Sequence, residues 1–181
     1  IQTNPRPTTE ALAEFYASDY RRYYQSVTSP SEEYVRSQYK DVRMKYTVDF
    51  ILRRIEGPAI RQVLDVGCSE GAFFQAMRAA GYTGALAGVE PNPAFADYAA
   101  RRTGARVVSS LEQSGAGYDL VTLSHVFEHL LEPDRFLDQV KPRLSPGGLL
   151  YIDVPDADRY SSLADLHVAH VFHFTRRTLK A

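Results

Sequence analysis

The sequence has 181 residues, which is enough for one ordinary domain with an appendage. Its composition is that of a globular protein, and its formal net charge of -1 gives no field that would attract a nucleic-acid backbone or an anionic membrane. No apolar run approaches the roughly 20 residues that a membrane-spanning helix needs, and no secretory signal is recognisable. We therefore expect a chain that binds neither nucleic acid nor membrane.

The cysteine content favours a reducing compartment. A single cysteine, Cys68, cannot form an internal disulfide, and without partners it is a poor metal site. A cytoplasmic location is the resulting expectation. The chain begins at Ile1 rather than at a methionine, and it reaches Ala181 within what reads as a new helix. We therefore expect a fragment of a longer chain.

Two amphipathic helices are predicted at the start of the chain. In the first, over 9–25, aromatic residues recur at helical spacing after a threonine that can cap the start. The second begins with a capping box at Ser29, and its apolar stripe of tyrosine, valine, phenylalanine and isoleucine runs to about Ile55. Gly57 and Pro58 then break the helix.

The remaining residues alternate between short apolar runs and amphipathic stretches, a pattern typical of βαβ units. Continuous apolar runs suit parallel strands that are covered on both faces, and ligands bind such sheets at the carboxyl ends of the strands, where the strand order reverses. The predicted fold class is α/β, with a Rossmann-like, doubly wound, mainly parallel sheet and an amino-terminal helical extension. The predicted strands are 63–66, 85–90, 105–109, 119–124 and 149–154, and the predicted helices are 71–80, 93–103 and one from 133 that Pro142 ends or bends.

The segment after the first predicted strand is the most informative. Asp65 lies near the strand end, and a loop of small residues then opens a helix. Gly67 and Gly71 let the backbone approach a ligand, and the helix start offers free N–H groups and a positive dipole end. Glu90 ends the next strand, where a carboxylate can accept hydrogen bonds from both ribose hydroxyls. The plain alternatives are a turn that needs glycine and an ordinary solvated glutamate.

Together these elements resemble the first motif of class I S-adenosylmethionine-dependent methyltransferases, in which Gly, Cys, Gly, any residue, Gly follows an acidic strand end. Ser69 stands where that family usually has its middle glycine. The resemblance covers about residues 62–178, and the segment from His125 to Pro133 resembles one found in small-molecule methyltransferases of the ubiquinone-pathway and sugar-modifying types. It implies transfer of a methyl group from S-adenosylmethionine to a small-molecule acceptor, such as a sugar or another hydroxylated metabolite.

The resemblance also implies which residues bind the cofactor. Relatives often place an aspartate near the adenine, whereas here Glu112 lies slightly beyond that position. The methionine end of the cofactor is expected against Asp65, Gly67, Cys68, Ser69 and Gly71, and the ribose against Glu90. The adenine is expected beside Ser110 and Leu111, and the sulfonium beside Ser124 and His125.

All five histidines follow residue 124. His129 and His170 come after the fourth and fifth predicted strands, and we predict that they are catalytic, as a general base near neutral pH. For His129 the alternative is a structural hydrogen bond. His167, His170 and His173 are spaced in threes, which also suits metal ligands, but we predict no metal site.

Other functions stay open from the residues alone. A nicotinamide-dependent oxidoreductase would use Gly-x-Gly-x-x-Gly, whereas this loop has glycine only at 67 and 71. A cofactor-binding module without catalysis is the second alternative, because relatives add two strands after the fifth. Nothing after Val154 looks long enough for both, so we expect the domain, residues 59–181, to be truncated there. Residues 1–58 are interpreted as a lid over the site, as a plain helical layer, or as a homodimer contact.

Overall fold

The computed structural model describes residues 7–55, 60–167 and 169–179. Within these residues, five parallel strands form one sheet in the order β3-β2-β1-β4-β5, and the order reverses between β1 and β4. This confirms the predicted doubly wound α/β fold. The strands are β1 (Gln62–Val66), β2 (Ala85–Val89), β3 (Arg106–Val108), β4 (Tyr118–Ser124) and β5 (Leu144–Asp153). β5 begins earlier than predicted because Leu144 pairs with Tyr118 ahead of a register shift.

Helices cover both faces of the sheet. Val63 of β1 packs with residues of α4 (Lys40–Arg54) and α5 (Ala72–Ala79), while the next residue, Leu64, packs on the opposite face with Val140 of α7 (Pro133–Val140). A short turn with Pro142 follows α7, as expected from the missing N–H of proline. α6 (Pro93–Thr103) contributes Ala99 to the first of these two cores. The absence of alternation in the strand sequences therefore reflects burial on both sides.

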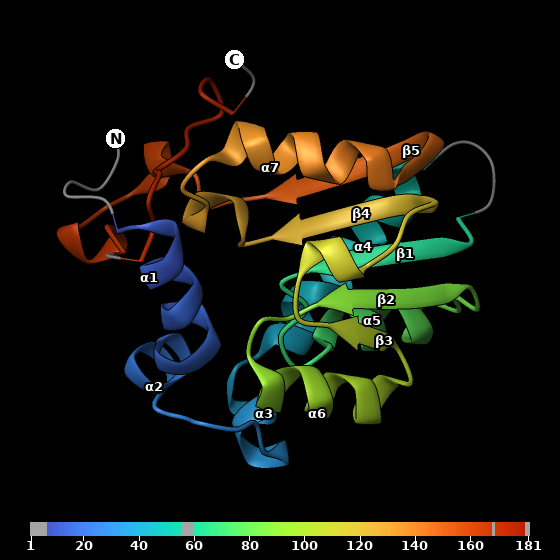
Figure 1. The fold of residues 1–181 in the computed structure, drawn as a ribbon, viewed down its shortest axis with the longest axis horizontal. Coiled ribbons are helices and arrows are strands. Elements are labelled where there is room, and N and C mark those ends of the chain that lie inside the picture. The colour runs from blue at the N-terminus through green and yellow to red at the C-terminus, as the bar shows by residue number, and fades with distance from the viewer. Residues whose placement is uncertain (1–6, 56–59, 168, 180–181) are drawn as a thin grey trace.

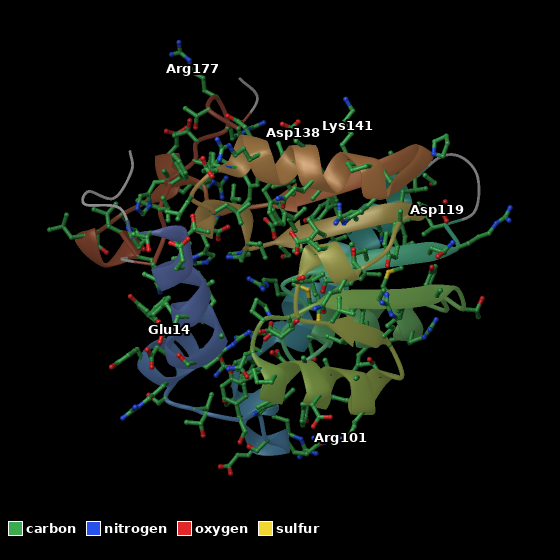
Figure 2. The ribbon with its side chains drawn as sticks, in the orientation of Figure 1. Glu14, Arg101, Asp119, Asp138, Lys141 and Arg177 are labelled. Carbon is green, nitrogen blue, oxygen red and sulfur yellow. The ribbon has the colours of Figure 1, made fainter. Side chains whose placement is uncertain are left out.

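The amino-terminal ends of the strands are joined at Asp119. Its carboxylate accepts hydrogen bonds from the backbone N–H groups of Arg61 and Gln62, at 2.8 and 3.0 Å, and from the hydroxyl of Ser145 at 2.9 Å. Figure 2 labels Asp119 on the side of the molecule away from α1 and α2. The carboxyl ends of the strands point toward those helices (Figure 1).

The predicted first helix is confirmed. α1 (Thr9–Glu14), a π-helical segment (Phe15–Asp19) and α2 (Tyr20–Gln25) follow one another without a break, and the Thr8 hydroxyl caps the start by accepting from the Ala11 N–H at 3.2 Å. Figure 1 shows α1 and α2 beside the carboxyl ends of the strands, with the segment after β5 next to α1. The described part of that segment includes 3-10 turns and an isolated bridge between Asp156 and Phe174.

The second predicted helix was wrong in part. It is divided into α3 (Glu32–Ser37) and α4, and Ser31 rather than Ser29 caps α3 by accepting from the Tyr34 N–H at 3.1 Å. The division comes at Tyr39, whose φ of 50° is left-handed. Helical spacing cannot reveal this break, because apolar residues continue across it. Gly57 and Pro58, the predicted helix breakers, lie outside the described residues.

The break also changes which face of α4 is buried. Four residues of the predicted stripe are exposed: Tyr39 (77%), Val42 (55%), Tyr46 (72%) and Phe50 (44%). Ile51, also part of that stripe, is buried as predicted, and it packs on the sheet together with Met44 and Val48, which the stripe did not include. A homodimer contact through the amino-terminal helices stays a prediction. Among the described residues, no helix is both long and apolar enough to cross a membrane.

Replacing two exposed tyrosines by glycine tests the break between α3 and α4. Tyr39→Gly removes the side chain from a left-handed residue and should raise the free energy of unfolding by roughly 1 kcal/mol. Tyr46→Gly removes an equally exposed ring from the helix interior and should lower it by roughly 0.5 kcal/mol or more. Urea unfolding followed by circular dichroism measures both. Loss of stability in both variants would place Tyr39 inside a continuous helix.

Candidate functional site

A cavity of about 1020 Å³ lies between the carboxyl ends of the strands and the amino-terminal helices. Its wall includes Tyr16, Tyr20 and Arg21 from the helical extension. The extension therefore forms part of the site rather than a layer remote from it. The sequence-predicted residues on the wall are Asp65, Gly67, Cys68, Ser69, Glu90, Ser110, Leu111, Ser124, His125, His129 and His170.

The loop after β1 folds over the end of β2. The N–H groups of Gly67 and Cys68 both donate to the carbonyl of Val89, at 2.8 and 3.0 Å. Gly67 has a φ of 74°, and a Cβ there would lie 2.5 Å from Val126, so only glycine fits. Ser69 has a φ of 51°, a conformation in which glycine is unstrained. Ser69 therefore replaces the usual middle glycine of the motif while keeping a backbone conformation that glycine would adopt.

Gly71 has a different role from the one expected. It does not line the cavity, and a Cβ at this position would lie 3.0 Å from Thr103 and 3.4 Å from Ala99, both on α6. Its φ of 84° and its place before α5 make it the turn into that helix. Glycine here permits close packing of α5 and α6, rather than approach of the backbone to a ligand.

Glu90 is buried, so the reading as a solvated glutamate was wrong. Its side chain is 4% exposed. One carboxylate oxygen accepts from the Asn92 N–H at 3.0 Å, and the other accepts from the Ser69 N–H at 3.0 Å and from Arg21 Nη2 at 3.2 Å. Glu90 thus joins the loop after β1, the start of α6 and the amino-terminal helices.

Sequence reasoning missed Arg21. Its side chain is 9% exposed, and its guanidinium lies 4.2 Å from the centroid of the Phe95 ring and donates to Gln25 at 2.9 Å. The available signal was a cation inside a helical stripe of tyrosines, four residues before a glutamine. That signal places Arg21 on an apolar face, but it does not identify Glu90 as its partner.

A second buried ion pair lies under the same loop and was also missed. Lys40 Nζ, at the start of α4, contacts Glu70 Oε2 at 2.9 Å and the Ser69 hydroxyl at 3.2 Å. Burial lowers the pKa of Lys40, and the charge of Glu70 partly offsets this. Burial opposes the charge of Glu70, yet Lys40 and hydrogen bonds hold the pKa of Glu70 below its ordinary value. The pair stabilises the loop from beneath.

Asp65 and Cys68 offer the cavity little charge. The Thr122 hydroxyl donates to Asp65 at 2.7 Å, and burial raises the pKa of Asp65 to about 7. Burial also raises the pKa of the Cys68 thiol, and the space that a Cβ of Gly88 would need is filled by this sulfur. A thiol in such surroundings is unreactive, so Cys68 acts through packing and its backbone.

The other side of the cavity carries imidazoles. His129 Nδ1 lies 2.7 Å from the Tyr16 hydroxyl and 2.9 Å from the Ala169 carbonyl. Burial lowers the pKa of His129 to about 4 and that of His170 to about 3. Both rings are therefore neutral at pH 7, and either would be a weak general base. Beside them, Glu128 is 1% exposed, and sequence reasoning missed it because a Glu-His pair after a strand gives no sign of burial.

His125 is strained at the end of β4. Its φ is 55°, and its backbone N–H donates to the Asp153 carbonyl of β5 at 2.8 Å. Left-handed conformations in residues other than glycine concentrate at functional sites. The turn brings its Nδ1 to 3.5 Å from Glu128 Oε1.

Comparison with known proteins identifies the family. Residues 32–181 match the family described as methyltransferase domain. A ubiquinone biosynthesis O-methyltransferase of Vibrio atlanticus is 29% identical over 113 residues, which are 58% of this chain and 47% of that protein. An uncharacterized methyltransferase of Mycolicibacterium gilvum is 35% identical over 111 residues, 56% of this chain and 43% of that protein. The chain spans about half the length of these curated relatives.

Solved structures share the fold. The plantazolicin methyltransferase BpumL, in complex with SAH, has a TM-score of 0.65 at 18% identity, covering 94% of this chain and 71% of its own. A SAM-dependent methyltransferase from Archaeoglobus fulgidus has a TM-score of 0.63 at 23% identity, covering 81% of this chain and 70% of its own. The family match extends over most of the sequence and includes every strand described above. The chain belongs to the methyltransferase domain family.

Proposed function

We propose that this chain binds S-adenosylmethionine in the cavity and transfers its methyl group to a small-molecule acceptor. The observation that carries the proposal is the buried Glu90 carboxylate at the end of β2, beside the glycine loop after β1. Family membership supports the reaction class, and two structures of the same fold are named for SAM or SAH. Family membership also argues against the alternative of a nicotinamide-dependent oxidoreductase.

Glu90 can hold a ribose if one of its present donors leaves. A carboxylate offers about four acceptor positions, and the described residues fill three of them. A ribose diol needs two. The donors from Ser69 and Asn92 are backbone N–H groups, whereas Arg21 is a side chain at the longest of the three distances. We therefore expect Arg21 to give way to the ribose.

The other predicted cofactor residues, except Gly71, line the same cavity. Asp65 and the loop lie at the end of β1, Ser110 and Leu111 follow β3, and Ser124 and His125 end β4. When bound, S-adenosylmethionine supplies a methyl group that its sulfonium already activates. The protein then has to hold the acceptor in line with that methyl group and exclude water.

The acceptor side suits a hydroxylated small molecule, such as a sugar. Its wall combines rings with polar tips, including Tyr16, Tyr20 and Tyr160, with His129 and His170. Such walls bind an apolar ring face and its hydroxyl groups together. We propose that His129 and His170 act on the acceptor. Because their pKa values are low, the two imidazoles are weak bases at neutral pH. They are therefore better suited to binding an acceptor oxygen than to removing its proton.

The ribose assignment is tested by Glu90→Gln, which keeps the size of the side chain. Charge-assisted hydrogen bonds contribute roughly 1.5 to 3 kcal/mol each, so S-adenosylmethionine and S-adenosylhomocysteine should both bind at least about tenfold more weakly. Titration calorimetry measures both affinities. A 2′,3′-dideoxy analogue of S-adenosylhomocysteine should bind the parent and the variant alike. If the parent and Glu90→Gln bound the natural ligands equally well, Glu90 would not be the residue that binds the ribose.

Arg21→Met is the matched control for that experiment, because Glu90→Gln also weakens the ion pair with Arg21. If the ribose displaces Arg21, then Arg21→Met should bind S-adenosylmethionine as tightly as the parent or more tightly. A loss of affinity equal to that of Glu90→Gln would mean that the ion pair itself organises the pocket.

Methyl transfer is tested with S-adenosylmethionine that is radiolabelled on its methyl group and with a panel of sugars, phenols and hydroxy acids. Label should appear in a hydroxylated acceptor, in a one-to-one ratio with S-adenosylhomocysteine. Glu90→Gln should reduce the rate at low cofactor concentration more than at saturation. Tight cofactor binding without transfer to any acceptor would favour the module without catalysis.

A further inference from the structure

Glu128 is a buried carboxylate without a hydrogen-bond donor among the described residues. It lies in the 3-10 turn after β4 (Phe127–His129), and its side chain is 1% exposed. Neither of its oxygens accepts a hydrogen bond from any residue that the structure describes. An ionised carboxylate in such surroundings is strongly disfavoured without a cation or a proton beside it. Both neighbouring ion pairs of the cavity, at Glu70 and Glu90, satisfy this requirement with a lysine or an arginine.

Imidazole nitrogens, rather than cationic side chains, are grouped around one oxygen of Glu128. His125 Nδ1 lies 3.5 Å from Glu128 Oε1, His170 Nε2 lies 3.9 Å from it, and His129 Nε2 lies 4.0 Å from it. These distances are too long for direct hydrogen bonds. Two atoms that each lie about 2.0 to 2.2 Å from a shared tetrahedral ion are roughly 3.3 to 3.6 Å apart. The distances from His129 and His170 exceed this separation by a few tenths of an ångström.

The second ring nitrogen of His129 fixes the orientation that a metal ligand needs. Its Nδ1 lies 2.7 Å from the Tyr16 hydroxyl, which can donate or accept, and 2.9 Å from the Ala169 carbonyl, which can only accept, so the carbonyl favours the tautomer with the proton on Nδ1. In the neutral ring, Nε2 then has a free lone pair directed toward Glu128. Metal-binding histidines commonly donate their other N–H to a backbone carbonyl in this way.

We propose that Glu128, His129 and His170 bind one divalent transition-metal ion, with zinc as the best match. Their ligand atoms lie within 4.8 Å of one another, so the side chains must draw together slightly around the ion. Imidazole combined with carboxylate suits zinc, iron and cobalt, whereas magnesium and calcium prefer oxygen ligands. The proposal departs from the sequence-based prediction of no metal site.

The histidine spacing of three does not define this site. His167 stacks on the His170 ring at 4.7 Å, and His173 Nδ1 lies 3.1 Å from the Tyr160 hydroxyl, so both rings face other partners. The ligands instead come from the turn after β4 and from the segment after β5. The spacing in the sequence therefore groups His170 with His167 and His173, whereas the geometry groups it with Glu128 and His129.

Three protein ligands leave an open coordination position, as in catalytic zinc sites. His129 and His170 line the cavity, so the open position faces it and can take water or an oxygen of the acceptor. With the ion bound, the two histidines act on the acceptor through the metal rather than directly. Only this last role rests on the proposed methyl transfer. Metal binding itself can be measured without cofactor or acceptor, and it can therefore fail or succeed independently of the proposed function.

The test is titration of the chelator-treated protein with zinc, cobalt and magnesium chlorides, one at a time. Calorimetry should show one zinc ion per chain with a dissociation constant in the micromolar range or below. Cobalt should give visible absorption bands of a four- or five-coordinate ion, and magnesium should give no saturable heat. No saturable zinc binding, or binding of magnesium alone, would overturn the assignment.

Variants locate the ion. Glu128→Gln and His170→Asn should each weaken zinc binding at least tenfold, and zinc should raise the melting temperature of the parent but not of either variant. His173→Asn, a nearby histidine with a different partner, is the matched control and should bind zinc like the parent. If Glu128→Gln does not fold, as judged by circular dichroism, the zinc affinity of His170→Asn decides whether the site is correctly assigned. Parent-like affinity in a folded His170→Asn variant would overturn the proposal.

Discussion

The carboxylate of Glu90 is the point on which the site depends. It is buried at the end of β2, where it holds the loop after β1 through the Ser69 N–H, the start of α6 through the Asn92 N–H, and α2 through Arg21. A buried charge requires partners of this kind, so the loop, the sheet and the helical extension are constrained together. Removing the carboxylate would leave Arg21 buried without its counter-ion. The sheet and the helical extension therefore form the cavity together.

The sheet separates two kinds of chemistry along its carboxyl edge. At β1 and β2, backbone N–H groups and paired carboxylates form a polar pocket of fixed geometry. At β4 and β5, the strained turn at His125 leads to neutral imidazoles and to Glu128. Both lie at the point where the strand order reverses, which is where ligands bind in open α/β sheets. One cavity can therefore place two different molecules side by side.

Most of the fold could be predicted from the sequence because its signals are local. Apolar runs located the strands, and glycine at 67 has a left-handed φ of 74°, although the neighbour that a Cβ there would meet is the Val126 side chain. Gly71 produced the same local signal for another reason, the packing of α5 against α6. Composition cannot separate these two uses of glycine. The break at Tyr39 escaped detection because nothing in its side chain favours a left-handed backbone.

The parts of the site that the sequence did not reveal depend on pairs that are distant along the chain. Arg21 and Glu90 are 69 residues apart, and Lys40 and Glu70 are 30 apart. Taken alone in the sequence, each of these four residues would be interpreted as an ordinary solvent-exposed charge. Glu128 is a further example, because its burial follows from the return of the segment around Ala169 and His170 to the end of β4. Only the fold brings these groups together.

The three buried carboxylates around the cavity differ in how their charge is balanced, and the difference follows the two halves of the site. Glu70 and Glu90 receive Lys40 and Arg21, and both cations come from the helical extension. The extension thus completes the electrostatics of the pocket after β1 and β2. On the other half it contributes Tyr16, which meets His129 through a neutral hydroxyl, and Arg43, whose charge lowers the pKa of Glu128 by less than burial raises it. Balance at Glu128 must come from a proton or from a bound cation, and the imidazoles around it select for the cation that accepts nitrogen ligands.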